Sequence, residues 1–259
     1  MIVSEAREFK DLHAREAGTW AVKDGAAHGQ EVRSMFARIS GVYDFMNHLL
    51  SFNRDKAWRK NVAARLDKDT WEVLDLCAGT GDLALTCIAA GKGRIWIAAD
   101  FCPEMLVGAH GKKNAEQLEL SAADAMNLPF RSRSVDAVTV GFGVRNFADV
   151  RRGLAEIVRV LRPGGQLMVL EFYRDNPAGA GEGRGVPALI RFGLNRVIPL
   201  LGKIVGRDSA AYSYLPNSMG EFLTPDEFAA LLKEFEFDEV IVERQTFGIA
   251  HIVGGRTRQ

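Results

Sequence analysis

The sequence LDLCAGTGDLA, residues 74–84, carries the pattern that decides the fold. Its apolar first half leads into Gly79 and Gly81, and a helical pattern begins at Asp82. The spacing Gly79-x-Gly81-x-x-Ala84 matches the fingerprint of nucleotide-binding α/β proteins, in which glycines let the backbone turn tightly close to a ligand. We therefore predict a buried strand, a ligand-binding turn and a helix. The ligand is either a dinucleotide with its phosphates or a molecule that carries none.

Strand and helix patterns alternate on both sides of this stretch. Apolar runs predict strands over residues 71–77, 94–100, 117–124, 134–143 and 162–172. Helices are expected to begin at Asp82, at Pro103, at about Ala148 and after the cap-like Thr224-Pro225. Two more strand-like runs, 237–245 and 246–256, close the chain. Strands separated by helices predict a Rossmann-like, doubly wound, mostly parallel α/β sheet.

The limits of the alternating strand and helix pattern indicate the domain organisation. Residues 1–30 are polar and predict a flexible N-terminal arm, and residues 31–259 predict a single domain that opens with an amphipathic helical pattern. The glycine-rich segment 174–187 predicts a flexible loop. Beyond it, 186–223 predicts a helical insertion.

The overall composition excludes several classes of protein. The chain has 33 Lys and Arg residues against 33 Asp and Glu residues, so it lacks the bulk attraction to phosphate backbones on which most nucleic-acid binders rely. Its three cysteines have no paired C-x-x-C spacing, which argues against a disulfide framework and a zinc site and favours the cytoplasm. No apolar leader and no run of about 18 apolar residues occur, so we expect neither a signal peptide nor a spanning helix.

Asp82, directly after the second glycine, distinguishes the two kinds of ligand. A dinucleotide places its pyrophosphate on the bare N-terminus of the helix, where amide donors attract negative charge. A fixed carboxylate at Asp82 competes for those donors and repels phosphate. S-adenosylmethionine carries a sulfonium and a zwitterionic tail but no phosphate, so Asp75 and Asp82 are compatible with it. An NAD-dependent oxidoreductase stays the alternative that the glycine fingerprint allows.

Asp100 and Asp124 end two successive predicted strands. Both should lie at the carboxyl edge of the sheet, where ligands of open α/β sheets bind. Asp100 stands where a ribose-binding carboxylate belongs. Asp124 can accept a hydrogen bond from an adenine amino group, beside the backbone of Ala125. An ordinary helix or turn cap is the alternative for Asp124.

Longer motifs resemble those of known enzymes. The segments DLCAGTGDLA, DAMNLPF and RVLRPGGQLMVLEF, with Asp100, resemble successive motifs of class I S-adenosylmethionine-dependent methyltransferases. Three others are similar to the ubiquinone/menaquinone biosynthesis C-methyltransferase family: YDFMNHLLSF (43–52), GFGVRNFAD (141–149) and DSAAYSYLPNSM (208–219). The resemblance implies a seven-stranded sheet with an antiparallel last strand, and methylation of a ring carbon of a polyprenylated quinol. It implies cofactor contacts at Thr80, Asp100, Asp124, Ala125 and Gly141, and the glycine turn adds Gly79 and Gly81 as predicted cofactor-binding residues.

Methylation of a hydroquinone carbon requires loss of a hydroxyl proton, so the enzyme must stabilise an oxyanion and align two reactants. Arg145 and Asn146 follow the fourth predicted strand and are the candidates for this role. Because arginine stays protonated, it would stabilise the phenolate or hold a water that takes the proton, and no metal is needed. An arginine that pairs with a nearby acid to fix a loop is the alternative. Tyr43 is expected to cap the cofactor pocket unless it is a core tyrosine, and His48 and His251 are candidate proton acceptors.

The polyprenyl tail of such an acceptor needs an apolar surface. Segment 186–206 has an apolar stripe flanked by basic residues, which predicts either weak contact with the inner membrane surface or a helix packed on the sheet edge. A homodimer is left open. The nearest competing function is a methyltransferase of the same fold with another small apolar acceptor, and a binding module without catalysis is a further one.

Overall fold

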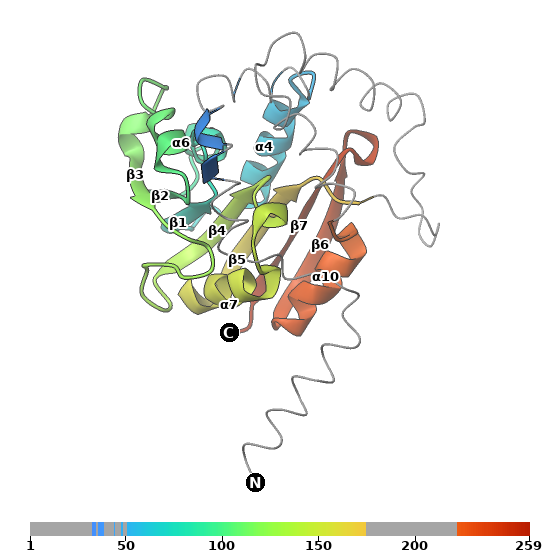
Figure 1. Ribbon diagram of the computed structural model, residues 1–259. Helices are drawn as coiled ribbons and strands as arrows, with labels where there is room; N and C mark the ends of the chain where they lie inside the picture. The colour runs from blue at the N-terminus through green and yellow to red at the C-terminus, as the bar shows by residue number, and fades with distance from the viewer. Residues whose placement is uncertain (1–32, 35, 39–43, 45–47, 49–50, 175–221) are drawn as a thin grey trace.

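The computed structural model describes residues 33, 34, 36–38, 44, 48, 51–174 and 222–259. The strands in this part of the chain are β1 (Glu72–Leu76), β2 (Ile95–Asp100), β3 (Leu118–Ala122), β4 (Val135–Gly141), β5 (Leu161–Glu171), β6 (Phe237–Gln245) and β7 (Ala250–Thr257). They form one seven-stranded sheet in the order β3-β2-β1-β4-β5-β7-β6 (Figure 1). The winding direction reverses between β1 and β4, which is where ligands bind in sheets of this kind.

The strand directions agree with the predicted sheet. Neighbouring strands from β3 to β5 are parallel, whereas β7 is antiparallel to both β5 and β6. This confirms the Rossmann-like doubly wound sheet with an antiparallel last strand.

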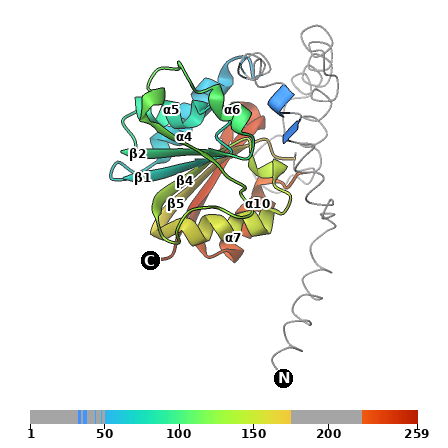
Figure 2. The ribbon, with the colours of Figure 1, turned by 60° about the vertical axis from the view of Figure 1, so that its left-hand side comes forward.

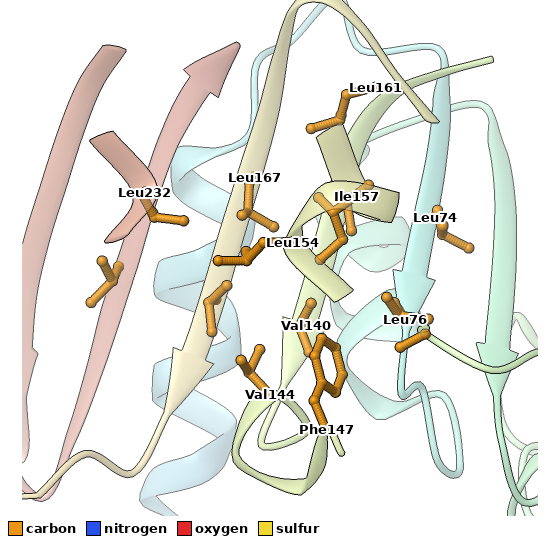
Figure 3. Close-up of a cluster of buried hydrophobic side chains, with 14 of the residues drawn as sticks. Leu74, Leu76, Val140, Val144, Phe147, Leu154, Ile157, Leu161, Leu167 and Leu232 are labelled. Carbon is orange, nitrogen blue, oxygen red and sulfur yellow. The ribbon is translucent and has the colours of Figure 1, made fainter. Parts of the chain in front are cut away.

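Helices cover both faces of the sheet (Figure 2). The helices α4 (Arg54–Arg65), α5 (Asp82–Ala89) and α6 (Pro103–Val107) lie on one face, and α7 (Val150–Val160) and α10 (Pro225–Glu234) lie on the other. Trp58 and Trp96 are the largest buried side chains of the first layer. Leu154, Ile157 and Leu232 fill the second layer (Figure 3). Because both faces are covered, the central strands are buried on both sides, as their nearly continuous apolar runs require.

Helix starts follow local capping chemistry. The helices α5 and α6 begin at Asp82 and Pro103, as predicted. At the start of α10, Glu227 N donates to Thr224 Oγ1 at 3.2 Å while Glu227 Oε2 accepts from Thr224 N at 2.7 Å, which completes a capping box. The helix α7 begins two residues later than expected, because Asp149 caps it by accepting a hydrogen bond from Arg152 N.

Several predicted segments lie outside the described residues. These are the arm over 1–30, the part of the glycine-rich loop beyond Arg174, and 186–223 apart from Phe222 and Leu223. Phe222 is buried in the core beside α10. Every helix in the described ranges is too short or too polar to span a bilayer.

Candidate active site

The glycine turn joins β1 to α5 at the carboxyl edge of the sheet. Gly79 and Gly81 have φ values of 56° and 77°, which residues with a β-carbon rarely adopt. A β-carbon at Gly81 would also lie 3.0 Å from Leu118 Cδ1. The backbone therefore makes the tight turn that the sequence predicts.

Asp100, the last residue of β2, holds this turn through its carboxylate. Oδ2 accepts a hydrogen bond from Gly79 N at 2.8 Å, and Oδ1 accepts one from Cys102 N at 2.8 Å. Burial raises the pKa of Asp100, although the two backbone hydrogen bonds oppose the rise. Each oxygen keeps a second lone pair, so the contact with a ribose remains chemically available and stays a prediction.

Asp75 is fully buried in β1, behind the turn. Oδ1 accepts from Thr139 Oγ1 at 2.7 Å and Oδ2 accepts from Ala84 N at 3.2 Å. Burial nevertheless raises the pKa of Asp75 to about 7. This carboxyl group therefore changes charge near neutral pH.

Asp82 begins α5, and two cations neutralise its carboxylate. Lys112 Nζ lies 2.7 Å from Oδ1, and Arg59 Nη1 lies 3.2 Å from Oδ2. The prediction that Asp82 competes for the amide donors of α5 is wrong: in the described part of the chain its carboxylate binds Lys112 and not a backbone amide. Charged donors attract a carboxylate more strongly than neutral amides do. Repulsion of phosphate by Asp82 is reduced accordingly. Neither cation is predictable from the sequence near Asp82, since both come from other parts of the chain.

The two cations belong to a larger network of charges. Arg59 Nη1 lies 2.7 Å from Asp55 Oδ2, and Lys112 Nζ lies 2.6 Å from Asp44 Oδ2. His48 Nδ1 also lies 2.6 Å from Asp55 Oδ2, so this candidate proton acceptor is engaged with a carboxylate. The network ties the segment before β1 to the glycine turn.

A small cleft, open to solvent, lies over the turn. Its wall brings together three of the predicted cofactor residues, Gly79, Thr80 and Gly141. Thr80 is buried, and its Oγ1 donates to Asp44 Oδ1 at 2.5 Å. A β-carbon at Gly141 would lie 3.2 Å from Leu83 Cδ2, so glycine lets β4 approach α5 closely here.

Asp124 and Ala125 follow β3 and are not among the described residues that line this cleft. Asp124 is exposed, and its Oδ1 accepts a hydrogen bond from Met126 N at 2.8 Å. Asp124 therefore caps a turn, which was the alternative to a role in adenine binding. Ala125 is buried. Their contact with an adenine stays a prediction.

Arg145 lies four residues beyond the end of β4, in the 3₁₀ helix η3 (Val144–Asn146). Its Nη1 donates to Phe142 O at 2.9 Å and forms an ion pair with Glu171, which is fully buried at the end of β5. This is the pairing with a nearby acid that the sequence left open. Burial raises the pKa of Glu171, and the charge of Arg145 opposes that rise. Nε of Arg145 is buried and has no hydrogen-bond partner in the described part of the chain.

Gly143 sets the spacing between η3 and the glycine turn. A β-carbon at Gly143 would lie 2.4 Å from Cys77 Cβ and 2.8 Å from its Sγ. Asn146 N donates to Gly143 O at 3.0 Å and closes the 3₁₀ turn. The loop that carries Arg145 therefore packs closely against Cys77, directly after β1. Tyr43 lies outside the described residues, and its role stays a prediction.

The buried Tyr173 and the half-buried His251 lie close to Glu171. His251 faces Glu171 across the ladder of β5 and β7, and its ring meets that of Tyr173 edge-on with centroids 5.9 Å apart. Tyr173 Oη and His251 Nδ1 have no hydrogen-bond partner among the described residues. Burial and the charge of Arg244 lower the pKa of His251 to about 4. His251 is therefore neutral at pH 7 but a weak base.

Comparison with known proteins assigns the chain to a family. The model of the ubiE/COQ5 methyltransferase family matches residues 24–256. The chain belongs to this family. The demethylmenaquinone methyltransferase of Thermus thermophilus is 43% identical over 86% of this chain and 100% of that protein. The protein of the same name from Deinococcus radiodurans is 39% identical over 92% and 97% of the two chains.

Solved structures agree with the fold of this ubiE/COQ5 family member. An S-adenosylmethionine-dependent methyltransferase of Thermotoga maritima has a TM-score of 0.57 and 18% identity, over 87% of this chain and 99% of that chain. Human N-acetylserotonin methyltransferase has a TM-score of 0.53 and 19% identity, over 85% and 59%. At these identities the likeness concerns the fold alone. Family and fold together identify the chain as a methyltransferase.

Proposed function

We propose that this methyltransferase transfers the methyl group of S-adenosylmethionine to a ring carbon of a polyprenylated quinol, in menaquinone or ubiquinone biosynthesis. The observation that carries the proposal is the pair of relatives named demethylmenaquinone methyltransferase, aligned over 86% and 92% of the chain. A relative from Geobacter sulfurreducens, 35% identical over 88% of the chain, is named ubiquinone/menaquinone biosynthesis C-methyltransferase UbiE. These names favour a demethylmenaquinol acceptor.

The residues around the glycine turn fit the methyl donor. When bound, S-adenosylmethionine supplies an electrophilic methyl group on a cationic sulfonium. Asp75 and Asp82 line the cleft. Asp82 Oδ2 is buried and accepts no hydrogen bond from the described residues, even though Arg59 Nη1 lies 3.2 Å away, so it can accept one from a donor group of the ligand. The donor-binding residues would be Gly79, Thr80 and Gly141 in the wall of the cleft, Gly81 in the turn, Asp100 at the ribose, and Asp124 with Ala125 at the adenine.

Arg145 would stabilise the phenolate that forms when the quinol loses its proton. Glu171 and Phe142 O fix one nitrogen of the guanidinium, while Nε stays buried and unpaired by the described residues. A fixed donor in a water-poor site stabilises a developing oxyanion more than the same donor does in water. The pairing with Glu171 therefore supports the catalytic role, because it orients the guanidinium. Asn146 would orient the same oxygen, and Tyr43 would cap the donor.

The acceptor's polyprenyl tail implies contact with a lipid surface. We propose a cytoplasmic protein with weak peripheral contact at the inner membrane, through the apolar stripe of 186–206. Flotation with anionic liposomes tests this contact. Protein found entirely in the soluble fraction would contradict it.

Mass analysis of extracted quinones tests the proposed reaction. A host that lacks this chain should accumulate a quinone lighter by one methyl group, and the wild-type chain should restore the normal species. The variant Arg151→Gln should restore the normal species as well, because Arg151 pairs with Glu234 on the exposed surface and lies outside the proposed site. An unchanged quinone profile in the deficient host would overturn the acceptor assignment, and a different unmethylated metabolite would favour another apolar acceptor.

A further inference from the structure

Arg59 is a buried cation in the wall of the donor cleft that the proposed function does not use. Its side chain, from α4, is only 9% exposed. The Nη1 atom lies 2.7 Å from Asp55 Oδ2 and 3.2 Å from Asp82 Oδ2. Arg59 also opposes, through its charge, the burial-driven rise in the pKa of Asp75. A positive charge is thus held among the carboxylates of the cleft.

Both contacts of Arg59 use the same nitrogen. Nη2 and Nε make no hydrogen bond to the described residues, although a guanidinium has five N–H donors in a planar fork. Arg59 lines the cleft, so these remaining donors are available to a ligand there. Asp55 does not depend on Arg59 alone, since it also accepts from Ser51 Oγ and contacts His48 Nδ1, both at 2.6 Å.

Asp82 presents the opposite charge beside Arg59. Lys112 binds Oδ1 of Asp82 at 2.7 Å, which leaves Oδ2 on the side of Arg59. Oδ2 is buried and receives no hydrogen bond from the described residues, although Arg59 Nη1 and His48 Nε2 lie 3.2 and 3.9 Å from it. A cation with unused donors and an anion with an unused acceptor therefore lie side by side in one cleft. The amino-acid tail of the methyl donor has the complementary pattern, because its carboxylate and its ammonium group are attached to the same carbon.

We propose that Arg59 binds the carboxylate of the donor's amino-acid tail and that Asp82 Oδ2 accepts a hydrogen bond from its ammonium group. The inference rests on the proposed function, since it requires the donor to bind in this cleft. A guanidinium matches a carboxylate in a bidentate manner, and its burial reduces screening by salt. The ligand recognised is thus a nucleoside that bears an α-amino acid, and a nucleoside without that tail loses both contacts.

Calorimetry with two nucleosides tests the proposal. S-adenosylhomocysteine carries the amino-acid tail, whereas 5′-methylthioadenosine keeps the adenosine and the sulfur but lacks the tail. Arg59→Gln should weaken binding of S-adenosylhomocysteine about ten- to hundredfold, as expected for loss of charged hydrogen bonds. The affinity for 5′-methylthioadenosine should change by less than about threefold. Lys60→Gln is the matched control, because Lys60 is the exposed neighbour on α4 and should alter neither affinity.

Two results would overturn the proposal: an equal loss of affinity for both nucleosides, and an unchanged affinity for S-adenosylhomocysteine. The first would show that Arg59 shapes the cleft without reading the tail. A wild-type chain that bound neither nucleoside would instead overturn the donor site itself, and with it the proposed function.

A ligand-side experiment avoids the risk that Arg59→Gln unfolds, since that variant removes the cation shared by Asp55 and Asp82. Decarboxylated S-adenosylhomocysteine keeps the ammonium group and lacks only the carboxylate. The wild-type chain should bind it about ten- to hundredfold more weakly than S-adenosylhomocysteine. Equal affinities for the two ligands would overturn the assignment of Arg59.

Discussion

The two half-sites that we propose at the carboxyl edge of the sheet are built differently. The donor half, at the ends of β1 and β2, is a backbone turn, and the carboxylate of Asp100 holds it through Gly79 N. The acceptor half, at the ends of β4 and β5, depends on one side chain, Arg145, which is held by the fully buried Glu171. The shape of the turn depends on backbone conformation and so on several residues. A buried ion pair depends on two side chains, and loss of either one leaves the other charge buried without a partner. Damage should therefore be greater on the acceptor half.

Glu171→Ala is expected to have the largest effect. It leaves the Arg145 guanidinium buried without its counter-ion, which typically costs about 3–5 kcal/mol in the free energy of unfolding. Urea denaturation measures the loss. The double variant Glu171→Leu with Arg145→Met should recover most of that stability, because two apolar side chains replace the pair. If Glu171→Ala lowers the free energy of unfolding by less than about 1 kcal/mol, the ion pair is as weak as an exposed one. The acceptor half would then be no more sensitive to substitution than the donor half.

Arg145→Lys should separate chemistry from donor binding. Lysine keeps a positive charge for Glu171 but lacks the planar fork and the Nε donor. We expect kcat to fall about 10²- to 10³-fold, the usual cost of losing one oxyanion donor. The affinity for S-adenosylhomocysteine should stay within about twofold of the wild-type value. Steady-state kinetics and calorimetry together measure this difference, and a parallel loss of both quantities would show that the two halves are not independent.

Asp100→Ala tests the donor half in the same way. Loss of charged hydrogen bonds to the ribose should weaken S-adenosylhomocysteine binding by about 1.5–3 kcal/mol. Titration calorimetry measures the change, and Asp100→Asn serves as the variant of matched size. An unchanged affinity would make the ribose assignment untenable.

The smallest effect concerns pH and His251 on the acceptor half. Burial lowers the pKa of His251 to about 4 in the folded chain, against about 6.5 when unfolded. Between these values the unfolded chain binds more protons, so His251 makes the protein less stable as pH falls from 6.5, by about 2 kcal/mol at pH 5. Above pH 6.5 it has no such effect. His251→Phe should flatten the stability curve from urea denaturation at pH 7 and pH 5, and an unaltered slope would assign the titration to other groups.

The donor half is also the half that the sequence predicts well. Gly79, Gly81 and the strand-end Asp100 have positions fixed by local spacing, so motif and periodicity suffice to place them. Glu171 was missed because its partner, Arg145, is 26 residues away. An acid inside the apolar run LMVLEF is nevertheless a signal, since a buried carboxylate needs a partner. Arg59 was missed for the same reason: its contact with Asp82 depends on how α4 packs beside α5.

The contact between Gly143 and Cys77 limits how proteins of this design can diversify. A β-carbon added at position 143 would lie only 2.4 Å from Cys77 Cβ, so the backbone of Gly143 packs too closely on Cys77 to leave room for a side chain. Reacting atoms must approach to about 3–3.5 Å, and a side chain at position 143 could only move them apart. New acceptors of different size must therefore be accommodated on the outer wall of the pocket. In the proposed reaction, substrate range can then change over evolution while the gap across which the methyl group passes remains constant.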